Sequence, residues 1–330
     1  MKDEIGTKIT GLGAFVPSKV LTNFDLEKTV DTTDEWIRTR TGISERRIVE
    51  NGEVTSDLAT AASKEAIKNA GLKPTDIDLI ILATISPDMV FPATACIVQN
   101  KLGCRPIAGF DISAACSGFP YALSIADGLI RAGQYKHVLV IGAEVLSPFI
   151  DWTDRSTCIL FGDGAGAAVL SATTQKTRGL IATYMGSDGS AADILKIPAG
   201  GSALPASHET VKQKMHTVKM SGSELFKIAV RTMGDAVIEV CRKANLDPKD
   251  IDCLIPHQAN LRIIQAVAER LEMPMSKIFI NLDRYGNMSA ASTAVALYEA
   301  IKTGRVKSGS NVVLVAFGGG LTWASCVLKW

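Results

Sequence analysis

Short apolar runs alternate with amphipathic segments along the chain, a pattern that is typical of an α/β protein. Residues 79–84 and 107–112 are rich in apolar and β-branched side chains and predict buried strands. Between them, residues 93–102 predict a helix that ends at Gly103. Strands separated by helices in this way pair in parallel, because the helix carries the chain back across the sheet.

The chain contains an internal repeat. Residues 70–80 and 244–254 lie 174 positions apart and are identical at six of eleven positions. The apolar runs 138–142 and 312–316 recur at the same spacing. Agreement in the same order at separate places predicts that the chain arose by duplication of one α/β unit.

We therefore expect an N-terminal half, residues 1–175, and a C-terminal half, residues 176–330. Two duplicated halves that pack about a pseudo-twofold axis bring their equivalent strand-to-helix corners face to face, so a functional site is expected between them. The segment 186–210, rich in Gly, Ala, Ser and Pro, is either a surface linker or a lid over that region.

Composition and charge exclude several classes of protein. Hydrophobic residues make up 47% of the 330 residues and charged residues 21%, which is the composition of a globular protein rather than a disordered one. The net charge of +1 provides no overall attraction to nucleic acid or to an anionic membrane. Residues 1–4 do not lead into the apolar stretch of a secretory signal. The longest apolar runs, about seven residues, are too short to span a membrane. We expect a cytoplasmic protein with no nucleic-acid or membrane partner.

The cysteines indicate neither disulfides nor a metal. Seven cysteines are scattered along the chain without a CxxC pair, which fits neither a disulfide framework nor a zinc site. We expect six of them to be small buried apolar residues in a reducing compartment. Cys116 is the exception.

Cys116 lies between the strand at 107–112 and a helix over 121–131. The unpaired N–H groups and the positive dipole at a helix N-terminus favour the thiolate, which is the form that attacks carbonyl groups. The neighbours at 114–118 are small and leave room for a substrate. The alternative is an ordinary buried cysteine.

The repeat places Asn287 opposite Cys116, because the helix that ends at Gly304 corresponds to the one that ends at Gly133. His257 follows a predicted strand and directly precedes a helix, at the edge of an α/β sheet where sites form. Taken alone, Asn287 is a candidate helix cap and His257 a candidate structural histidine. Together, the three residues come from corners of both halves.

Cysteine, histidine and asparagine at one place indicate acyl-thioester chemistry, in which a thiolate takes an acyl group and polar donors stabilise an oxyanion. The glycines at 318–320 leave room for a backbone N–H to approach that oxygen. A papain-like protease uses the same residue types, but its cysteine motif is absent. The glycine-rich segments 11–13 and 162–166 lack the complete motifs of phosphate-binding loops.

Over nearly all of its length the chain resembles the β-ketoacyl-acyl carrier protein synthase III family, which starts type II fatty-acid synthesis. The motifs that carry the resemblance are DTTDEWI at 31–37, RTRTGI at 38–43, AACSGF at 114–119, FGDGAG at 161–166, PHQAN at 256–260, GN at 286–287 and FGGG at 317–320. The resemblance implies a thiolase-like, duplicated αβαβα fold of five layers and a homodimer.

The resemblance also implies a mechanism. Cys116 would take a short acyl group, such as acetyl, from acyl-CoA, and malonyl-acyl carrier protein would then lose CO2 and attack the acyl-Cys116 thioester. His257 and Asn287 would stabilise the enolate, and the backbone N–H groups of Cys116 and Gly319 would bind the tetrahedral oxyanion. No metal or organic cofactor is expected, since coenzyme A is part of the substrate.

Further residues match binding positions of the family. Those matching the coenzyme A and pantetheine tunnel are Thr32, Trp36, Arg40, Arg155, Phe226, Asn260 and Phe317. Phe91 matches a residue that walls the acyl pocket of the partner subunit. Lys227, Arg262 and Arg270 match a basic surface for acyl carrier protein, although Glu269 interrupts it. For Trp36 the alternative is a core residue, and for the arginines it is a solvated charge.

Two other functions are compatible with these residues. A related thiolase-fold synthase would use the same cysteine, histidine and asparagine with another acyl acceptor. A non-catalytic acyl-CoA-binding subunit would keep the tunnel without turnover. The acyl group that the enzyme prefers is not encoded in any of the motifs above.

Overall fold

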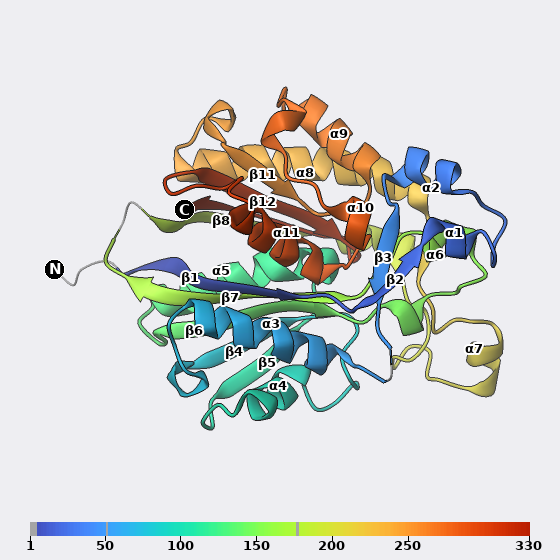
Figure 1. Ribbon diagram of the computed structural model, residues 1–330, viewed down its shortest axis with the longest axis horizontal. Coiled ribbons are helices and arrows are strands. Elements are labelled where there is room, and N and C mark those ends of the chain that lie inside the picture. The colour runs from blue at the N-terminus through green and yellow to red at the C-terminus, as the bar shows by residue number, and fades with distance from the viewer. Residues whose placement is uncertain (1–4, 51, 176–177) are drawn as a thin grey trace.

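The protein is described by a computed structural model that covers residues 5–50, 52–175 and 178–330 (Figure 1). The acidic start at residues 1–4, which the sequence analysis used to exclude a secretory signal, lies outside these described residues. None of the described helices combines the length and the apolarity needed to cross a membrane.

The first sheet contains five strands in the order β1-β7-β6-β4-β5. Strand β4 pairs in parallel with both β5 and β6, whereas β7 is antiparallel to β6 and β1. Two helices, α3 and α4, cover its outer face (Figure 1). The bounds are β1 Gly6–Phe15, α3 Thr55–Asn69, β4 Leu79–Ala83, α4 Thr94–Leu102, β5 Ala108–Ile112, β6 His137–Glu144 and β7 Gly164–Thr173.

The second sheet repeats four of these strands in the order β11-β12-β13-β8. Here β11 is parallel to β12, and β13 is antiparallel to both β12 and β8. Helices α8 and α9 cover its outer face. The bounds are β8 Gly179–Ser187, α8 Gly222–Ala244, β11 Cys253–Pro256, α9 Leu261–Arg270, β12 Asn311–Gly318 and β13 Thr322–Lys329.

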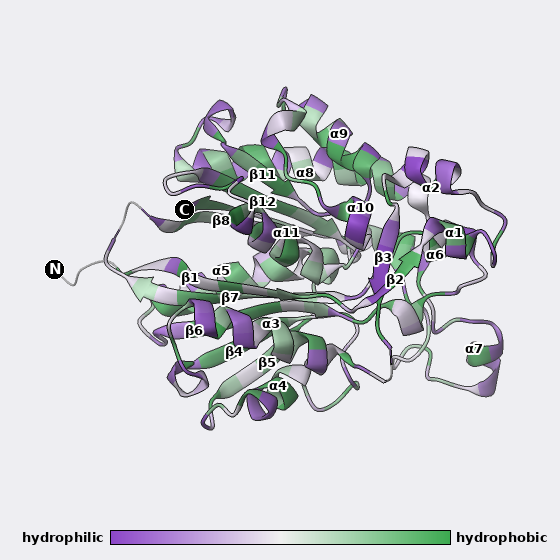
Figure 2. Ribbon diagram, viewed as in Figure 1, coloured by the Kyte–Doolittle hydropathy of each residue, from purple (hydrophilic) through white to green (hydrophobic). Residues whose placement is uncertain are grey.

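Two helices, α5 (Gly118–Arg131) and α11 (Ala290–Lys302), lie between the sheets and complete five layers (Figure 1). The central core joins both halves, since Phe119 of α5 and Leu297 of α11 belong to one apolar cluster with strand residues of both sheets. Figure 2 shows that the strands are mostly hydrophobic and that hydrophilic residues lie on the outer helices. The fold is the duplicated αβαβα arrangement that the sequence analysis expected.

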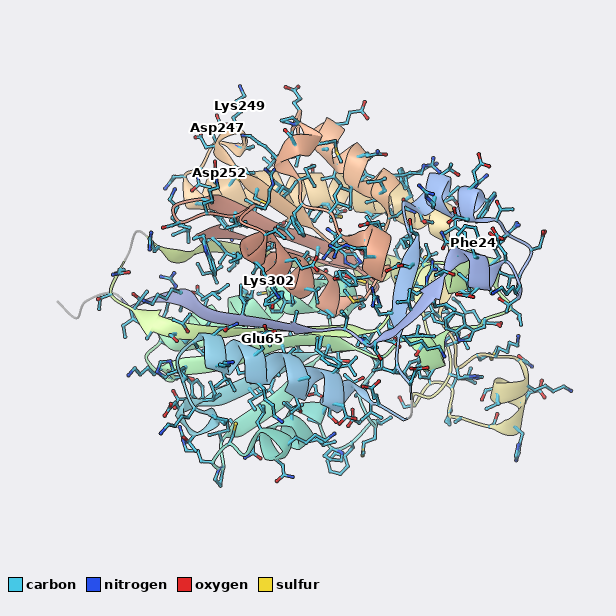
Figure 3. All side chains as sticks on the ribbon, viewed as in Figure 1. Phe24, Glu65, Asp247, Lys249, Asp252 and Lys302 are labelled. Carbon is cyan, nitrogen blue, oxygen red and sulfur yellow. The ribbon has the colours of Figure 1, made fainter. Side chains whose placement is uncertain are left out.

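Polar contacts also join the halves. Tyr298 of α11 donates a hydrogen bond to Glu65 of α3 over 2.6 Å, and Lys302 donates to the Tyr298 oxygen over 3.0 Å. Glu65 and Lys302 are labelled in Figure 3. The predicted boundary between residues 175 and 176 stays a prediction, because residues 176–177 lie outside the described part of the chain.

The remaining short elements gather mainly at one end of the sandwich, on the right of Figure 1. Strands β2 and β3 pair antiparallel, with α1 and α2 between them in the chain, and β9, which lies within the segment 186–210, pairs antiparallel with β10. The bounds are β2 Lys19–Thr22, α1 Asn23–Leu26, α2 Asp34–Thr41, β3 Glu45–Ile48, α6 Arg155–Cys158, β9 Leu195–Lys196, α7 His208–Lys212, β10 Lys219–Met220 and α10 Leu282–Tyr285.

One local expectation is confirmed by the structure and another is wrong. The helix predicted over 93–102 is α4, and it ends at Gly103 in the left-handed conformation, with φ of 71°. The cysteines form no disulfide in the described part of the chain, but the expectation that all except Cys116 are buried is wrong. Cys96 is exposed and Cys104 is half-buried, because both lie at the outer edge of the first sheet around α4.

Candidate active site

Cys116 lies in the turn between β5 and α5 and is 6% exposed. The preceding residue, Ala115, has a φ of 45°, so the backbone turns sharply where the chain leaves the strand. Gly318, at the end of β12, packs directly against this turn: a Cβ atom there would lie 2.6 Å from the Cys116 nitrogen. Glycine at 318 therefore allows the two halves to meet at the cysteine.

Asn287 is fixed by its own backbone. Its N–H donates to the Leu160 carbonyl over 2.8 Å, and its carbonyl accepts from the Gly162 N–H over 3.0 Å. The side-chain oxygen Oδ1 accepts from the Ser289 N–H over 2.8 Å. Because the oxygen is engaged in this way, the amide nitrogen Nδ2 is left as a donor to the cavity.

His257 directly follows β11, and its N–H donates to the Val315 carbonyl over 2.8 Å. Burial lowers the pKa of His257 to about 3, so the imidazole is neutral at pH 7. Its Nδ1 atom is buried and has no hydrogen-bond partner among the described residues. Protonation at Nδ1 would strand a donor there, so the single proton is assigned to Nε2.

The three side chains line one cavity of about 590 Å³ between the halves. Much of its wall is apolar and comes from α8, α9 and the segment before β7. The sequence analysis missed these lining residues, which include Leu160, Phe161, Leu225, Ala229, Met233 and Ile263. The residues on α8 and α9 belong to apolar helix faces. In a sequence, a helix face that lines a cavity cannot be distinguished from one that packs in an ordinary core.

The protonation state of Cys116 corrects an expectation. Burial raises the pKa of the thiol to about 12, the nearby carboxylate of Glu144 acts in the same direction, and the Ser289 hydroxyl and a backbone N–H oppose them. Burial therefore acts against the thiolate that the helix N-terminus was expected to favour, and the resting cysteine is a thiol at pH 7. The proton must leave during the reaction.

The predicted coenzyme A residues fall into two groups. Arg40, Phe226, Asn260 and Phe317 line the cavity itself. The cavity wall does not include Trp36, Arg155 or Thr32. Arg40, which lines the cavity, also contacts the Trp36 ring. The guanidinium carbons of Arg40 and Arg155 lie 4.6 Å and 4.7 Å from the centre of the Trp36 ring. These are cation–π contacts.

Arg155 is also held by the backbone, because its Nη1 atom donates to the Asp31 carbonyl over 2.6 Å. The Thr32 hydroxyl beside it is buried and has no partner within the described ranges. For another aromatic ring to lie between them, the Trp36 ring and the Arg155 guanidinium would have to be about 7 Å apart, which is twice a normal van der Waals contact. In this conformation Arg155 therefore closes the face of Trp36.

The basic residues differ in their surroundings. Lys227 and Arg262 are exposed at the cavity wall. Arg270 lies outside it and forms an ion pair with Asp235 over 2.6 Å. Among the described residues, no group of three or more His, Cys, Asp or Glu side chains could hold a metal ion.

Two further predicted residues lie outside the cavity wall. Phe91 is 86% exposed on the loop between β4 and α4. Gly318 lines the cavity, whereas its neighbour Gly319 packs against Leu195. The wall also includes Leu195, from the segment 186–210, and Met220 of β10. This segment therefore contributes to the site, which a purely passive linker would not do.

Known proteins that are similar to this chain indicate one family. Residues 110–189 match the family model described as 3-oxoacyl-[acyl-carrier-protein (ACP)] synthase III, and residues 241–330 match the model of its C-terminal part. The chain is 57% identical over its full length to a protein of Caldanaerobacter subterraneus subsp. tengcongensis, covering 99% of that protein, which is named beta-ketoacyl-[acyl-carrier-protein] synthase III. This chain belongs to the 3-oxoacyl-[acyl-carrier-protein] synthase III family.

Other members of the synthase III family agree in sequence and structure. A Clostridioides difficile protein of the same name is 56% identical, and the match covers 98% of each chain. The crystal structure of 3-oxoacyl-[acyl-carrier-protein] synthase III from Aquifex aeolicus superposes with a TM-score of 0.91 at 51% identity, covering 98% of this chain and all of that one. The resemblance found in the sequence and its fold are confirmed, and the chain is a condensing acyltransferase of the synthase III family.

Proposed function

We propose that this chain condenses a short acyl-CoA, such as acetyl-CoA, with malonyl-acyl carrier protein through an acyl-Cys116 intermediate, releasing coenzyme A and CO2. The observation that carries the proposal is the shared cavity: a thiol from the first half and an imidazole and a carboxamide from the second line the same wall. Cysteine supplies the nucleophile and the other two supply neutral donors.

In the first half-reaction the Cys116 sulfur attacks the acyl-CoA carbonyl. The Cys116 thiol gives up its proton to water, the new C–S bond forms, the bond to coenzyme A breaks, and the leaving coenzyme A thiolate takes up a proton from water, so that the protons balance. The backbone N–H groups of Cys116 and Gly319 hold the oxyanion. Support for a donor at this place comes from the contact of the adjacent Gly318 with the Cys116 backbone.

In the second half-reaction malonyl-acyl carrier protein loses CO2, and the electron pair of the broken C–C bond becomes an enolate. The enolate carbon attacks the acyl-Cys116 carbonyl and the cysteine sulfur leaves. Negative charge develops on the malonyl thioester oxygen, where His257 Nε2–H and Asn287 Nδ2–H donate hydrogen bonds. The neutral state of His257 is compatible with this role, since a neutral imidazole still has one N–H to donate and adds no charge to the buried site.

The tunnel for coenzyme A and pantetheine is formed by Thr32, Trp36, Arg40, Arg155, Phe226, Asn260 and Phe317. Asn260 caps α9 and donates from Nδ2 to the Arg40 carbonyl over 3.1 Å, which ties the two sides of the opening together. The resemblance to the family implies that the adenine ring of coenzyme A lies between Trp36 and Arg155. Because Arg155 covers the face of Trp36, it has to swing away before that ring can enter. Binding of coenzyme A therefore includes one side-chain movement at the entrance.

Acyl carrier protein, which is acidic, docks at Lys227 and Arg262 in this proposal, because both cations are exposed at the cavity wall. Arg270 contributes less, since its charge is paired with Asp235. Glu269, exposed on the same helix, weakens the positive field further.

The active assembly is a homodimer formed at the outer edge of the first sheet. Strand β5 has a hydrogen-bonded strand neighbour on one side only among the described residues. Beside it, Met89, Val90 and Phe91 expose an apolar segment, and Phe110 of β5 is itself partly exposed. An open strand edge with an apolar patch is a pairing surface, and a second copy of this chain fits it by symmetry. Phe91 then reaches into the acyl pocket of the partner.

The test is a complete reaction with purified chain, acetyl-CoA and malonyl-acyl carrier protein. We expect coenzyme A and CO2 in equal amounts, together with the acetoacetyl product on the carrier. His257→Ala should still form the acyl-enzyme but release little CO2. Equal loss of both half-reactions in that variant would contradict the role given to His257.

The same assay separates the alternatives. Release of coenzyme A with a different acceptor, but without CO2 from malonyl-acyl carrier protein, would indicate a related synthase. Binding of acyl-CoA without release would indicate a non-catalytic subunit. Competition among straight and branched acyl-CoA substrates then identifies the preferred acyl group.

A further inference from the structure

The carboxyl group of Glu299 holds the short helix α10 at both ends. Its Oε2 atom accepts a hydrogen bond from Nδ2 of Asn281, the residue before α10, over 2.9 Å. Its Oε1 atom accepts from the hydroxyl of Tyr285, the last residue of α10, over 2.6 Å. Arg284 donates from Nη2 to Oε2 over 2.8 Å and pairs the charge. Only one residue separates Tyr285 from Asn287, so the end of α10 determines where the asparagine corner begins.

Gln258 joins the start of α10 to the histidine corner. It directly follows His257 and is 1% exposed. Its Nε2 atom donates to the Pro256 carbonyl over 2.7 Å and to the Phe279 carbonyl over 3.2 Å. Its Oε1 atom accepts from the Asn281 N–H over 3.0 Å. The orientation of the amide follows from these partners, since two carbonyl oxygens need a donor and the N–H needs an acceptor. One buried side chain therefore ties the histidine turn to α10.

The direction of the His257 ring depends on this support. Its Nδ1 atom has no hydrogen-bond partner in the part of the chain that the structure describes. A hydrogen bond at the second ring nitrogen is the usual means of fixing an imidazole whose other nitrogen is in use. Here the direction is set by the backbone of the turn and by packing. Val315 holds the His257 N–H, and Gln258 holds the carbonyl of Pro256.

These contacts form a hydrogen-bonded chain between the two donor corners, which we call the clamp. Its members are Gln258, Asn281, Glu299 and Tyr285. We propose that the clamp sets the spacing between His257 and Asn287, so that both side chains donate to one thioester oxygen during decarboxylation. None of its members lines the cavity, so they are positioning residues. The inference rests on the proposed function, because it concerns the donors of the second half-reaction.

The donors need such a link because separate elements hold them. His257 follows β11 of the second sheet. The backbone of Asn287 is bonded instead to Leu160 and Gly162, in the segment before β7 of the first sheet. An oxyanion donor acts at about 2.7–3.1 Å, and a displacement of about 1 Å can cost about 10²-fold in rate. A small shift between the two sheets would therefore separate the donors unless α10 moves with the histidine turn.

The clamp is suited to hold a fixed distance. Gln258 and Asn281 are each 1% exposed, and Tyr285 is 8% exposed. Burial raises the pKa of Tyr285 to about 12, and the Glu299 carboxylate acts in the same direction, so the hydroxyl keeps its proton and stays a donor at neutral pH. Hydrogen bonds in a buried, low-dielectric layer are stronger than exposed ones, so the chain resists stretching.

Two tyrosines of the chain give a matched comparison. Tyr285 donates to Glu299 within the clamp over 2.6 Å. Tyr298 donates to Glu65, outside the clamp, over the same distance of 2.6 Å. For each phenylalanine variant we measure CO2 release from malonyl-acyl carrier protein and acyl-Cys116 formation from acetyl-CoA. Tyr285→Phe should lower CO2 release about three- to tenfold and leave acylation unchanged. Tyr298→Phe should change neither rate, even if its melting temperature falls.

Two variants of Glu299 and one double variant separate positioning from folding. Glu299→Ala removes both contacts with α10 and should lower CO2 release about 10- to 100-fold, again without loss of acylation. Glu299→Gln should recover part of this loss, because the amide can accept from Asn281 and donate to the Tyr285 oxygen. Added to Asn287→Ala, Tyr285→Phe should have little further effect on CO2 release, since the donor that it positions is already gone.

Unchanged CO2 release in both Tyr285→Phe and Glu299→Ala would overturn the inference. Parallel loss of CO2 release, acylation and melting temperature in these variants would also overturn it, because that result assigns the clamp to folding alone. So would a full effect of Tyr285→Phe in the Asn287→Ala chain. If Glu299→Ala does not fold, the comparison of Tyr285→Phe with Tyr298→Phe decides. Absence of both the Cys116 adduct and CO2 release in the native chain would instead refute the proposed function.

Discussion

The two halves have the same strand order but different outer edges. Strands β1, β7, β6 and β4 of the first half correspond to β8, β13, β12 and β11 of the second, with the same parallel and antiparallel pairs. The first half adds β5, which leaves an open edge. At the matching place the second half has only a bridge between Leu254 and Ile278, continued by a hydrogen bond from the Phe279 N–H to the Leu254 carbonyl. The two halves have kept the strand-to-helix turns that form the site, but the outer edges of their sheets differ.

The corners themselves divide the chemistry. In the proposed mechanism the first half supplies the nucleophile Cys116, and the second supplies the donors His257 and Asn287. Both corners contain a residue with an unusual positive φ, Ala115 beside the cysteine and Ser289 after the asparagine. If these roles are right, a change in the second half removes the decarboxylation and leaves the acylation of Cys116 in place.

The largest effect is expected for Asn287→Ala. Removing one of two donors to the enolate oxygen should lower CO2 release from malonyl-acyl carrier protein about 10²–10³-fold. Acylation of Cys116 should stay within about threefold, because the cysteine corner keeps its own backbone donors. Radiolabelled malonyl-acyl carrier protein measures the first rate and intact mass the second. Asn245→Gly, in the same half but at the left-handed end of α8, is the control and should change neither.

Much of this division was predictable from sequence, and the reasons are local. The repeat at 70–80 and 244–254 identified the duplication, because turn residues and apolar runs recur in order. Cys116 followed from its place between a strand and a helix, and Asn287 followed from Cys116 through the spacing of the helices that end at Gly133 and Gly304. These inferences depend on turn residues, apolar runs and helix ends, which residues close together along the chain determine.

Other features depend on contacts between distant residues and were missed. The thiol state of Cys116 is one of them, since it is burial that raises the pKa of this group, and burial is a property of the folded chain. The ion pair of Arg270 with Asp235 joins α9 to α8 and has no signature in the chain.

The edge difference leads to the next prediction. Phe91→Glu places a charge on the exposed apolar segment beside β5, and we expect the dimer dissociation constant to rise about 30-fold or more, as for loss of an interface anchor of about 2 kcal/mol. Sedimentation velocity over a concentration series measures it. Phe24→Glu is the control, because Phe24 is also exposed but lies on α1 at another part of the molecule (Figure 3). Equal effects of the two variants, or a monomeric native chain, would remove β5 as the interface.

A smaller effect tests the contact between the corners. In Gly318→Ala the new Cβ atom would lie 2.6 Å from the Cys116 nitrogen, so the turn must shift. We expect the free energy of unfolding to fall by about 1–3 kcal/mol and acylation to slow. Gly128→Ala, in α5 where no atom lies within 4 Å of the new Cβ, should raise stability by about 0.5–1 kcal/mol. Urea denaturation compares them, and an undisturbed Gly318→Ala would contradict the close approach.

The smallest effect concerns the pH dependence of stability. The pKa of His257 is about 3 in the folded chain against 6.5 for an ordinary histidine, so below pH 6.5 the unfolded chain binds a proton that the folded one does not. The contribution of His257 to the free energy of unfolding is therefore fully present above pH 6.5. It is lost as the pH falls toward 3, by at most about 1.4 kcal/mol per pH unit. In His257→Gln the slope of unfolding free energy between pH 6 and 5 should decrease by up to this amount. An unchanged slope would mean that the imidazole is not buried.

The residue that takes the acyl group can be identified directly by mass spectrometry, which tests whether Cys116 is the nucleophile. Native chain, Cys116→Ala and Cys96→Ala are each incubated with acetyl-CoA and analysed by intact mass and peptide mapping. The account predicts one acetyl group on Cys116 in the native chain and in Cys96→Ala, whose cysteine is exposed but outside the cavity, and none in Cys116→Ala. An acetyl adduct that persists in Cys116→Ala would contradict it.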